Sequence, residues 1–192
     1  TSVPDSVYLF SFATSGDDGR SGLRFAWSTD KEHWFEVGRN YGYLRCDYGR
    51  WGSQKKMLNP CLKRLPGGEW LCTWKLNERD GYGQATSKDL IYWTSQKYSR
   101  TVPDFDGTRI KAMIAGEEQT GSVNRVSWSL VDGLNKNYEW NQYRNALFAE
   151  RPVQDGERFA GLKPVEATVV ACPERSKAIS SLLMGVFFED IN

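Results

Sequence analysis

A nine-residue motif occurs twice in this sequence and limits the fold more than any other feature. Residues 26–34 read AWSTDKEHW and residues 85–93 read ATSKDLIYW, so both copies follow A-x-S-x-D-x-x-x-W, 59 residues apart. An aromatic segment precedes each copy, at Tyr8–Phe12 and at Trp70–Trp74, and turn residues such as Ser15–Gly19 lie between segment and motif. Repeated units of three or four short strands are typical of propeller blades. The sequence therefore predicts two similar antiparallel sheets.

The residue types of the motif suggest what it does. Ser and Asp side chains hydrogen-bond to nearby backbone groups and so build turns. A Trp four residues after the Asp can anchor the strand that returns. We therefore expect Trp34 and Trp93 to be structural and to occupy equivalent buried positions. His33 is the only His and has no neighbouring nucleophile arrangement, so we expect a structural role for it as well.

A hairpin is expected after the second copy. Residues 102–107 are rich in Pro, Asp and Gly and mark a boundary. Arg109–Ala115 and Ser122–Val126 have strand character, with Glu117–Gly121 between them as the turn. This hairpin would open the part of the chain that follows the repeats.

A helix and two further strands are expected beyond the hairpin. Apolar residues recur every three to five positions across Ser129–Glu150, with Ser127 or Ser129 as the cap and Pro152 as the stop. Strands are then predicted at Ala167–Ala171 and Leu182–Phe188. The second run is continuously apolar, as in a parallel strand buried on both faces. Such a strand needs neighbours, so we expect the chain to be a fragment of a longer protein.

The predicted fold class is mainly β: two antiparallel propeller-like blades, then a connector with one helix, then C-terminal strands. We place the two-bladed module at residues 1–102, the hairpin and helical connector at 103–165, and the truncated start of a further domain at 166–192.

Charge and motifs argue against several functions. With 25 basic and 24 acidic residues and no basic block, nucleic acid and anionic membranes are poor partners. No apolar run approaches the roughly 18 residues of a membrane span. Gly81-Tyr82-Gly83 lacks the third Gly and helix of a phosphate loop, and Asp17-Asp18-Gly19 lacks the further ligands of a calcium loop. We expect neither a metal nor a cofactor.

Aromatic residues are unusually frequent, with eight Trp and nine Tyr. Flat rings with a polar edge suit stacking on sugar rings. Strands of β-rich folds also favour aromatic side chains for packing alone. Composition leaves both explanations open.

The four cysteines match no metal-binding spacing. A two-residue turn that pairs Leu65 with Gly68 sets Cys61 opposite Cys72, which would permit a disulfide. A turn centre one residue later sets Lys63 opposite Cys72 instead. The sequence does not choose between these two registers.

Two known families resemble parts of the chain. Residues 6–98, with both motif copies, Leu58-Asn59-Pro60 and Leu65–Gly68, resemble the first blades of five-bladed propeller glycosidases of family 43. Residues 182–192, especially GVFFEDIN at 185–192, are similar to the first barrel strand of family 51 α-L-arabinofuranosidases of gut Bacteroidetes, and Leu162–Val165 with the preceding helix resembles the connector before that barrel. The resemblance implies that residues 166–192 begin a catalytic domain whose remainder lies downstream. It also implies a periplasmic or extracellular protein that acts on arabinose-containing plant polysaccharides.

The resemblance argues against catalysis by this segment itself. Family 43 propellers carry an Asp base in an R-D-P motif, and the matching position here reads Leu58-Asn59-Pro60. An Asn side chain does not take a proton from water near neutral pH. The acid/base and nucleophile glutamates of family 51 lie far downstream of the matching strand. We therefore expect no catalytic residue here, and a blade region that is either structural or sugar-binding.

Four residues are candidates for substrate binding. Trp51, in the Gly49–Gly52 loop, is the first candidate for stacking on a sugar, because ligand groups often lie on loops between rigid strands. Arg50 and Asn59 would add hydrogen bonds to hydroxyls. The resemblance implies that Glu189 hydrogen-bonds arabinose at the C-terminal end of the barrel strand, whereas within a fragment it would be a solvated residue near the chain end.

The expected function is therefore that of an accessory carbohydrate-binding or structural module of an α-L-arabinofuranosidase, a glycoside hydrolase. The alternative is a free-standing β-sheet sugar-binding or interaction protein without catalytic activity. The sequence beyond Asn192 would distinguish the two, since the first requires a barrel there.

Overall fold

The computed structural model describes residues 4–77, 81–104 and 109–149, together with residues 160, 161, 163, 166–168 and 170. Residues 1–149 form one compact unit and residues 150–192 a second. In the second unit, the described residues of the strand predicted at Ala167–Ala171 have irregular backbone, so that prediction is wrong at residues 167, 168 and 170. The strand predicted at Leu182–Phe188 lies outside the described residues, as does Pro152.

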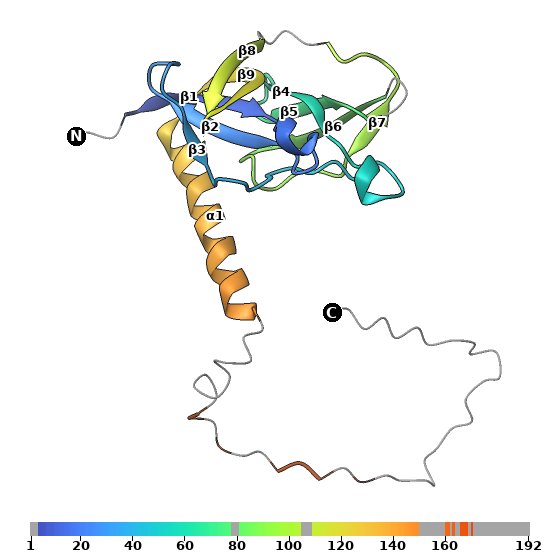
Figure 1. The fold of residues 1–192 in the computed structure, drawn as a ribbon, viewed down its shortest axis with the longest axis vertical. Helices are drawn as coiled ribbons and strands as arrows, with labels where there is room; N and C mark the ends of the chain where they lie inside the picture. Colours follow the sequence, from blue (N-terminus) through green and yellow to red (C-terminus); the bar gives the residue numbers. More distant parts are fainter. Residues whose placement is uncertain are drawn as a thin grey trace, which may run out of the picture. The chain divides into compact units, whose positions relative to one another are not determined.

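The first unit contains two antiparallel sheets and one helix (Figure 1), which confirms the mainly β prediction. The larger sheet has the order β3-β2-β1-β9-β8 and consists of β1 (Ser6–Phe12), β2 (Arg24–Ser28), β3 (Phe35–Val37), β8 (Arg109–Ile114) and β9 (Glu117–Ser127). The smaller sheet has the order β4-β5-β6-β7 and consists of β4 (Leu58–Arg64), β5 (Trp70–Lys75), β6 (Tyr82–Ser87) and β7 (Lys97–Ser99). Two short 3-10 helices, Ser15–Asp17 and Gly52–Gln54, lie in the connections.

The two sheets have matching registers around the repeated motif. Tyr8 of β1 pairs with Ser28 of β2, and Trp70 of β5 pairs with the corresponding Ser87 of β6. The strands β1, β2 and β3 therefore correspond to β5, β6 and β7. The sequence repeat marks a real structural repeat, as predicted.

The strand that corresponds to β4 comes from the far end of the unit. In the larger sheet β9 pairs along the whole of β1, with Arg125 opposite Tyr8, just as β4 sets Arg64 opposite Trp70. The hairpin that we expected in a separate connector thus belongs to the first sheet. Without β9, one edge of β1 would carry unpaired backbone N–H and C=O groups. The pairing with β9 satisfies these groups, which is the physical reason for this arrangement.

The turn of the β8–β9 hairpin differs from the predicted one. Ile114 pairs with Glu117, which leaves Ala115 and Gly116 as a two-residue turn with φ of 50° and 87°. Positive φ at both positions matches the right-handed twist of the flanking strands. The predicted turn at Glu117–Gly121 is therefore part of β9.

The β4–β5 hairpin has neither of the two registers considered from the sequence. Its turn has three residues, 66–68, with Gly68 at φ 86° and its N–H donating to the Leu65 carbonyl oxygen (2.9 Å). Leu62 therefore lies opposite Cys72, and Cys61 lies opposite Thr73. Cys61 and Cys72 are present as thiols, and burial raises the pKa of the Cys72 thiol.

The sheets share one core. Side chains from both sheets and from the helix form a single buried cluster that includes Leu9, Phe25, Leu62, Trp74 and Leu134. The opposite side of the larger sheet carries a smaller cluster of Phe10, Phe12, Ala26, Ala112 and Ile114. Because successive residues of a strand point to opposite faces, β1 contributes to both clusters.

The predicted helix is confirmed as α1 (Trp128–Phe148), with Ser127 at the N-cap position. The Ser127 hydroxyl is hydrogen-bonded to the Ser129 hydroxyl (2.9 Å) and makes no capping bond to a helix N–H. Val131 and Leu134 anchor the first half in the core, and the second half extends beyond the sheets (Figure 1). In the described part of the chain, no helix combines the length and apolar character needed to cross a bilayer.

Candidate functional site

The two motif copies form the same turn. In each copy the Ser hydroxyl donates to the Asp carboxylate, at 2.9 and 3.1 Å, and the carboxylate accepts the N–H groups of the second and third residues after it. The Trp indole N–H donates to the carbonyl of the residue after the Asp, at 3.1 and 3.2 Å. That residue, Lys31 or Leu90, has a φ of 65° or 63°. Trp34 and Trp93 are thus equivalent, but they are half-buried rather than buried because one ring edge must reach this exposed turn.

His33 belongs to the first turn. The His33 backbone N–H and imidazole both bond to Asp30, at 2.8 Å each, and these bonds hold the pKa of the Asp30 carboxyl well below its usual range. The same imidazole–carboxylate contact raises the pKa of His33. Glu32 brings a third possible metal ligand within 4.8 Å, and all three side chains are exposed. Because the Asp30 oxygens already accept the turn's hydrogen bonds, the turn accounts for this cluster.

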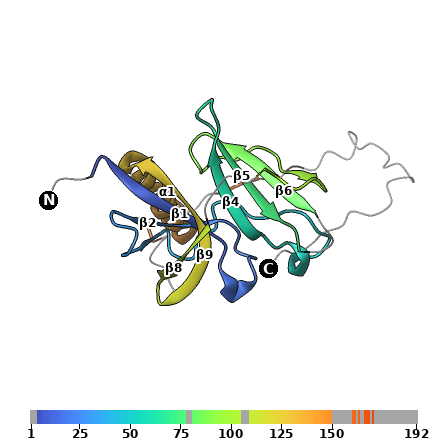
Figure 2. The same cartoon turned by 90° about the horizontal axis from the view of Figure 1, so that it is seen from above.

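Strands β4 and β9 lie side by side where the sheets meet (Figure 2). The Leu62 N–H donates to the Ser122 hydroxyl (3.2 Å), and the Asn124 side-chain amide donates to the Leu62 carbonyl (3.0 Å). Nearer the start of β4, the guanidinium of Arg109, which lies on β8, donates to the Asn59 carbonyl oxygen (3.3 Å). Side chains of β9 and β8 therefore hydrogen-bond to backbone groups of β4. A cavity lies toward each end of this seam.

Asn59 lies at the first cavity, of about 310 Å³, which we call the Asn59 cavity. Asn59 has a φ of 49° and lies within the register shift between Leu58 and Cys61. The residues that line this cavity are Ala13, Thr14, Ser15, Asp18, Gly19, Met57, Leu58, Asn59, Glu118, Gln119 and Thr120. Its two carboxylates are exposed, and each faces a lysine, with Asp18 3.1 Å from Lys56 and Glu118 2.7 Å from Lys111.

Arg50 and Trp51 are not among the residues that line the Asn59 cavity. They lie on the loop before the second 3-10 helix, where the Gln54 side-chain oxygen accepts both of their backbone N–H groups, at 3.0 and 3.2 Å. Trp51 exposes 65% of its surface. Among the four predicted binding residues, the structure thus places Asn59 in a cavity and presents Trp51 and Arg50 on a braced loop. Glu189 lies outside the described residues.

An exposed tyrosine pair next to this loop was missed from the sequence. The rings of Tyr48 and Tyr98 are 4.8 Å apart, with 51% and 38% of each residue exposed. Gln96 supports the pair, because it accepts the Tyr98 hydroxyl (2.9 Å) and the Asp47 N–H (3.1 Å). The partners are 50 residues apart in the chain, so no local pattern could have paired them.

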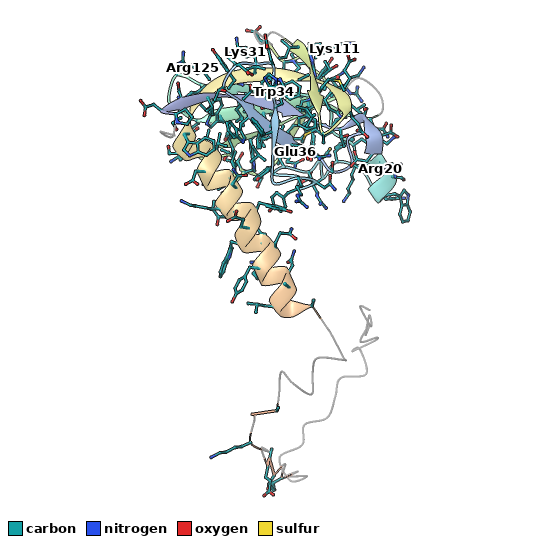
Figure 3. The ribbon with its side chains drawn as sticks, turned by 60° about the vertical axis from the view of Figure 1, so that its left-hand side comes forward. Arg20, Lys31, Trp34, Glu36, Lys111 and Arg125 are labelled. Carbon is teal, nitrogen blue, oxygen red and sulfur yellow. The ribbon has the colours of Figure 1, made fainter. Side chains whose placement is uncertain are left out.

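The second cavity lies toward the other end of the seam and is basic. It has a volume of about 660 Å³ and is lined by Tyr8, Lys31, Leu62, Lys63, Arg64, Ile110, Ser122, Val123, Asn124 and Arg125. We call it the basic groove. Its four cationic side chains come from three separate parts of the fold, which is why the sequence showed no basic block. Figure 3 shows Lys31 and Arg125 on the side of the sheets away from the free end of α1.

Comparison with known proteins found no relative of this chain. The chain matches no protein-family model, no curated protein and no solved structure.

Proposed function

We propose that this chain is a non-catalytic sugar-binding module and that it serves an α-L-arabinofuranosidase acting on plant polysaccharides outside the cytoplasm. The observation that carries sugar binding is the exposure of Trp51 on a loop that Gln54 holds in place. A large ring that is exposed and held at low entropic cost is what stacking on a sugar requires.

The tyrosine pair extends this surface. Tyr48 is three residues from Trp51, so their Cα atoms are within about 11 Å of each other by chain length alone. Tyr48 in turn stacks on Tyr98. Arg50 is next to Trp51 in the sequence, and Arg45 is three residues before Tyr48. Gln96 is hydrogen-bonded to the Arg45 carbonyl and to Tyr98. These three polar side chains are available to bind sugar hydroxyls. We propose that Trp51, Tyr48 and Tyr98 together bind adjacent units of a short arabino-oligosaccharide.

The absence of catalysis is supported by the side chains around the Asn59 cavity. A glycosidase of the inverting or retaining type needs one carboxyl that stays protonated and one that stays ionised. Asp18 and Glu118 are both exposed and each forms an ion pair with a lysine, so neither lies in the apolar, buried setting in which a glycosidase holds its general acid. Asn59 supplies an amide where the resembling propellers have a base. We propose that any arabinosidase activity belongs to a downstream domain, to which Glu189 would contribute.

The test is calorimetric titration of the chain with short arabino-oligosaccharides, followed in parallel by Trp fluorescence. We expect saturable binding that Trp51→Ala weakens about tenfold, or ~1.4 kcal/mol. Trp140→Ala is the matched control, because Trp140 is also exposed, at 59%, but lies on α1. Equal affinity in the parent and in Trp51→Ala, or no saturable binding at all, would exclude this site.

A further inference from the structure

We propose that the basic groove binds a short acidic oligosaccharide through the carboxylates of its uronic acid units. The saccharide class rests on the proposed function, whereas the negative charge of the ligand follows from the groove alone.

Three cations of the groove, Lys31, Arg64 and Arg125, have no acidic partner among the described residues. No Asp or Glu is among the described residues that line the groove. Grouping like charges in a concave site costs free energy unless an anion offsets their repulsion. The groove therefore has the charge of a site for a ligand with more than one negative group.

Aromatic rings and turns hold these cations in place. The Lys31 ammonium lies 4.5 Å from the centre of the Tyr8 ring, and the Arg64 guanidinium lies 5.5 Å from that of Trp70. The Arg125 guanidinium donates through Nε and Nη2 to the Ser6 hydroxyl, at 3.0 and 2.9 Å. Its terminal amino groups carry further donors in the fork geometry that binds carboxylates.

The structural repeat explains how the cations come to line one groove. Arg64 and Arg125 occupy equivalent positions on the equivalent strands β4 and β9, which meet at the seam. Lys31 occupies the position that the buried Leu90 has in the second motif copy. The same turn thus contributes to the core in one sheet and to the basic groove in the other. The repeat therefore contributes two equivalent arginines, one from each sheet, to the lining of one groove.

The lining favours a saccharide over nucleic acid. Single-stranded nucleic acid is bound by basic grooves with exposed rings on which bases stack. Here the Tyr8 ring is already covered by Lys31, and Trp70 is only 3% exposed. Ser122 and Asn124 add a hydroxyl and an amide for sugar hydroxyls. A volume of about 660 Å³ suits a few sugar units rather than a long polymer.

The test is titration of the full chain with trigalacturonate at low and at moderate salt. We expect saturable binding that weakens as salt rises, and at least tenfold weaker binding of the fully methyl-esterified trisaccharide, which has the same shape without the charge. Arg64→Gln and Arg125→Gln should each reduce the affinity for trigalacturonate about tenfold. Lys88→Gln removes one exposed charge outside the groove and should leave the affinity unchanged.

Several outcomes would overturn the proposal. Equal binding of the acid and its methyl ester, or unchanged affinity in both arginine variants with an unchanged melting temperature, would exclude the groove as the site. Tighter binding of tripolyphosphate or of a single-stranded oligonucleotide than of trigalacturonate would exclude the saccharide class. Arg125→Lys is the control for misfolding of the Arg125→Gln variant. Because it keeps the positive charge, its affinity for trigalacturonate should fall less than that of Arg125→Gln.

The proposed arabino-oligosaccharide site at Trp51 and the proposed uronic acid site in the basic groove can each be excluded without excluding the other. Loss of arabino-oligosaccharide binding in Trp51→Ala tests the aromatic surface and should leave trigalacturonate binding intact. If the neutral sugar does not bind but trigalacturonate binds in an Arg64- and Arg125-dependent way, the proposed function fails at its aromatic site and the groove stands. The reverse result would remove the groove alone.

Discussion

Gly83 shows at the residue scale how one missing side chain makes room for another. It lies opposite Trp74 across β5 and β6, and the Trp74 indole, which is fully buried, crosses the space that a Cβ atom on Gly83 would occupy. The Gly81-Tyr82-Gly83 segment, which the sequence excluded as a phosphate loop, thus has a packing role at its last residue.

We predict that Gly83→Ala destabilises the chain by about 1–3 kcal/mol, because the added methyl group must displace a close-packed ring. Urea unfolding followed by Trp fluorescence measures this. Gly67→Ala is the control, since a Cβ there meets nothing within 4 Å, and it should change the free energy of unfolding little. Equal stability of the parent and Gly83→Ala would mean that Trp74 does not occupy this position.

The pair Asp30 and His33 gives a pH prediction at the same scale. The folded pKa of His33 is raised by Asp30, so its stabilising effect is full below the ordinary value of 6.5 and is lost as the pH rises through the folded pKa. The folded pKa of Asp30 is lowered, so its effect is present above 3.8 and is lost as the pH falls through the folded pKa.

We therefore expect the His33 imidazole to titrate above 6.5 in an NMR titration, and to return toward 6.5 in Asp30→Asn. Glu32→Gln should lower the His33 pKa less than Asp30→Asn, because Glu32 contributes only a charge at a distance whereas Asp30 makes the hydrogen bond. A His33 pKa that is the same in the parent and in Asp30→Asn would show that the two side chains are not in contact in solution.

At the scale of elements, the two turns of the repeated motif were the most predictable part of the fold. Ser28, Asp30 and Trp34 act within seven residues of chain, so their residue types and spacing are sufficient to define the turn. The helix was equally visible, because its apolar spacing is local too. The β4–β5 register could not be predicted in this way. A three-residue turn and a two-residue turn both fit Pro66-Gly67-Gly68, and the two choices shift the strand pairing by one residue.

Strand β9 leads to a prediction about truncation. Without it, β1 has an open edge, and the smaller core cluster loses Ala112 and Ile114 from the same hairpin. We expect a chain that ends at residue 104 to aggregate or to unfold without a cooperative transition, because an exposed hydrophobic strand edge pairs with other chains.

Size-exclusion chromatography and thermal unfolding measure this effect. A chain that ends at residue 149 is the control, because it keeps the whole first compact unit and should remain monomeric with a cooperative transition. A monomeric, cooperatively folding chain of residues 1–104 would show that β9 is dispensable and that the domain boundary expected at residue 102 is real.

At the scale of the whole molecule, the candidate sites were the least predictable part. Asn59 was singled out because the short segment Leu58-Asn59-Pro60 could be compared with a family motif in the sequence alone. The basic groove was not, since Lys31, Arg64 and Arg125 are brought together only by the pairing of β1 with β9 and by the contact of β9 with β4. Long-range pairing leaves no local pattern, so a net charge of +1 concealed a strongly cationic surface.

The pairing of β1 with β9 also determines when the first sheet can be completed during synthesis of the chain. The residues of β1 and their partners on β9 are 109 to 121 positions apart. At the usual rate of synthesis, β1 emerges from the ribosome roughly 5–25 s before the strand that covers its edge. The β4–β7 sheet is made within this interval and has all its strands in order. We expect it to form first and to serve as the surface on which the first sheet is assembled.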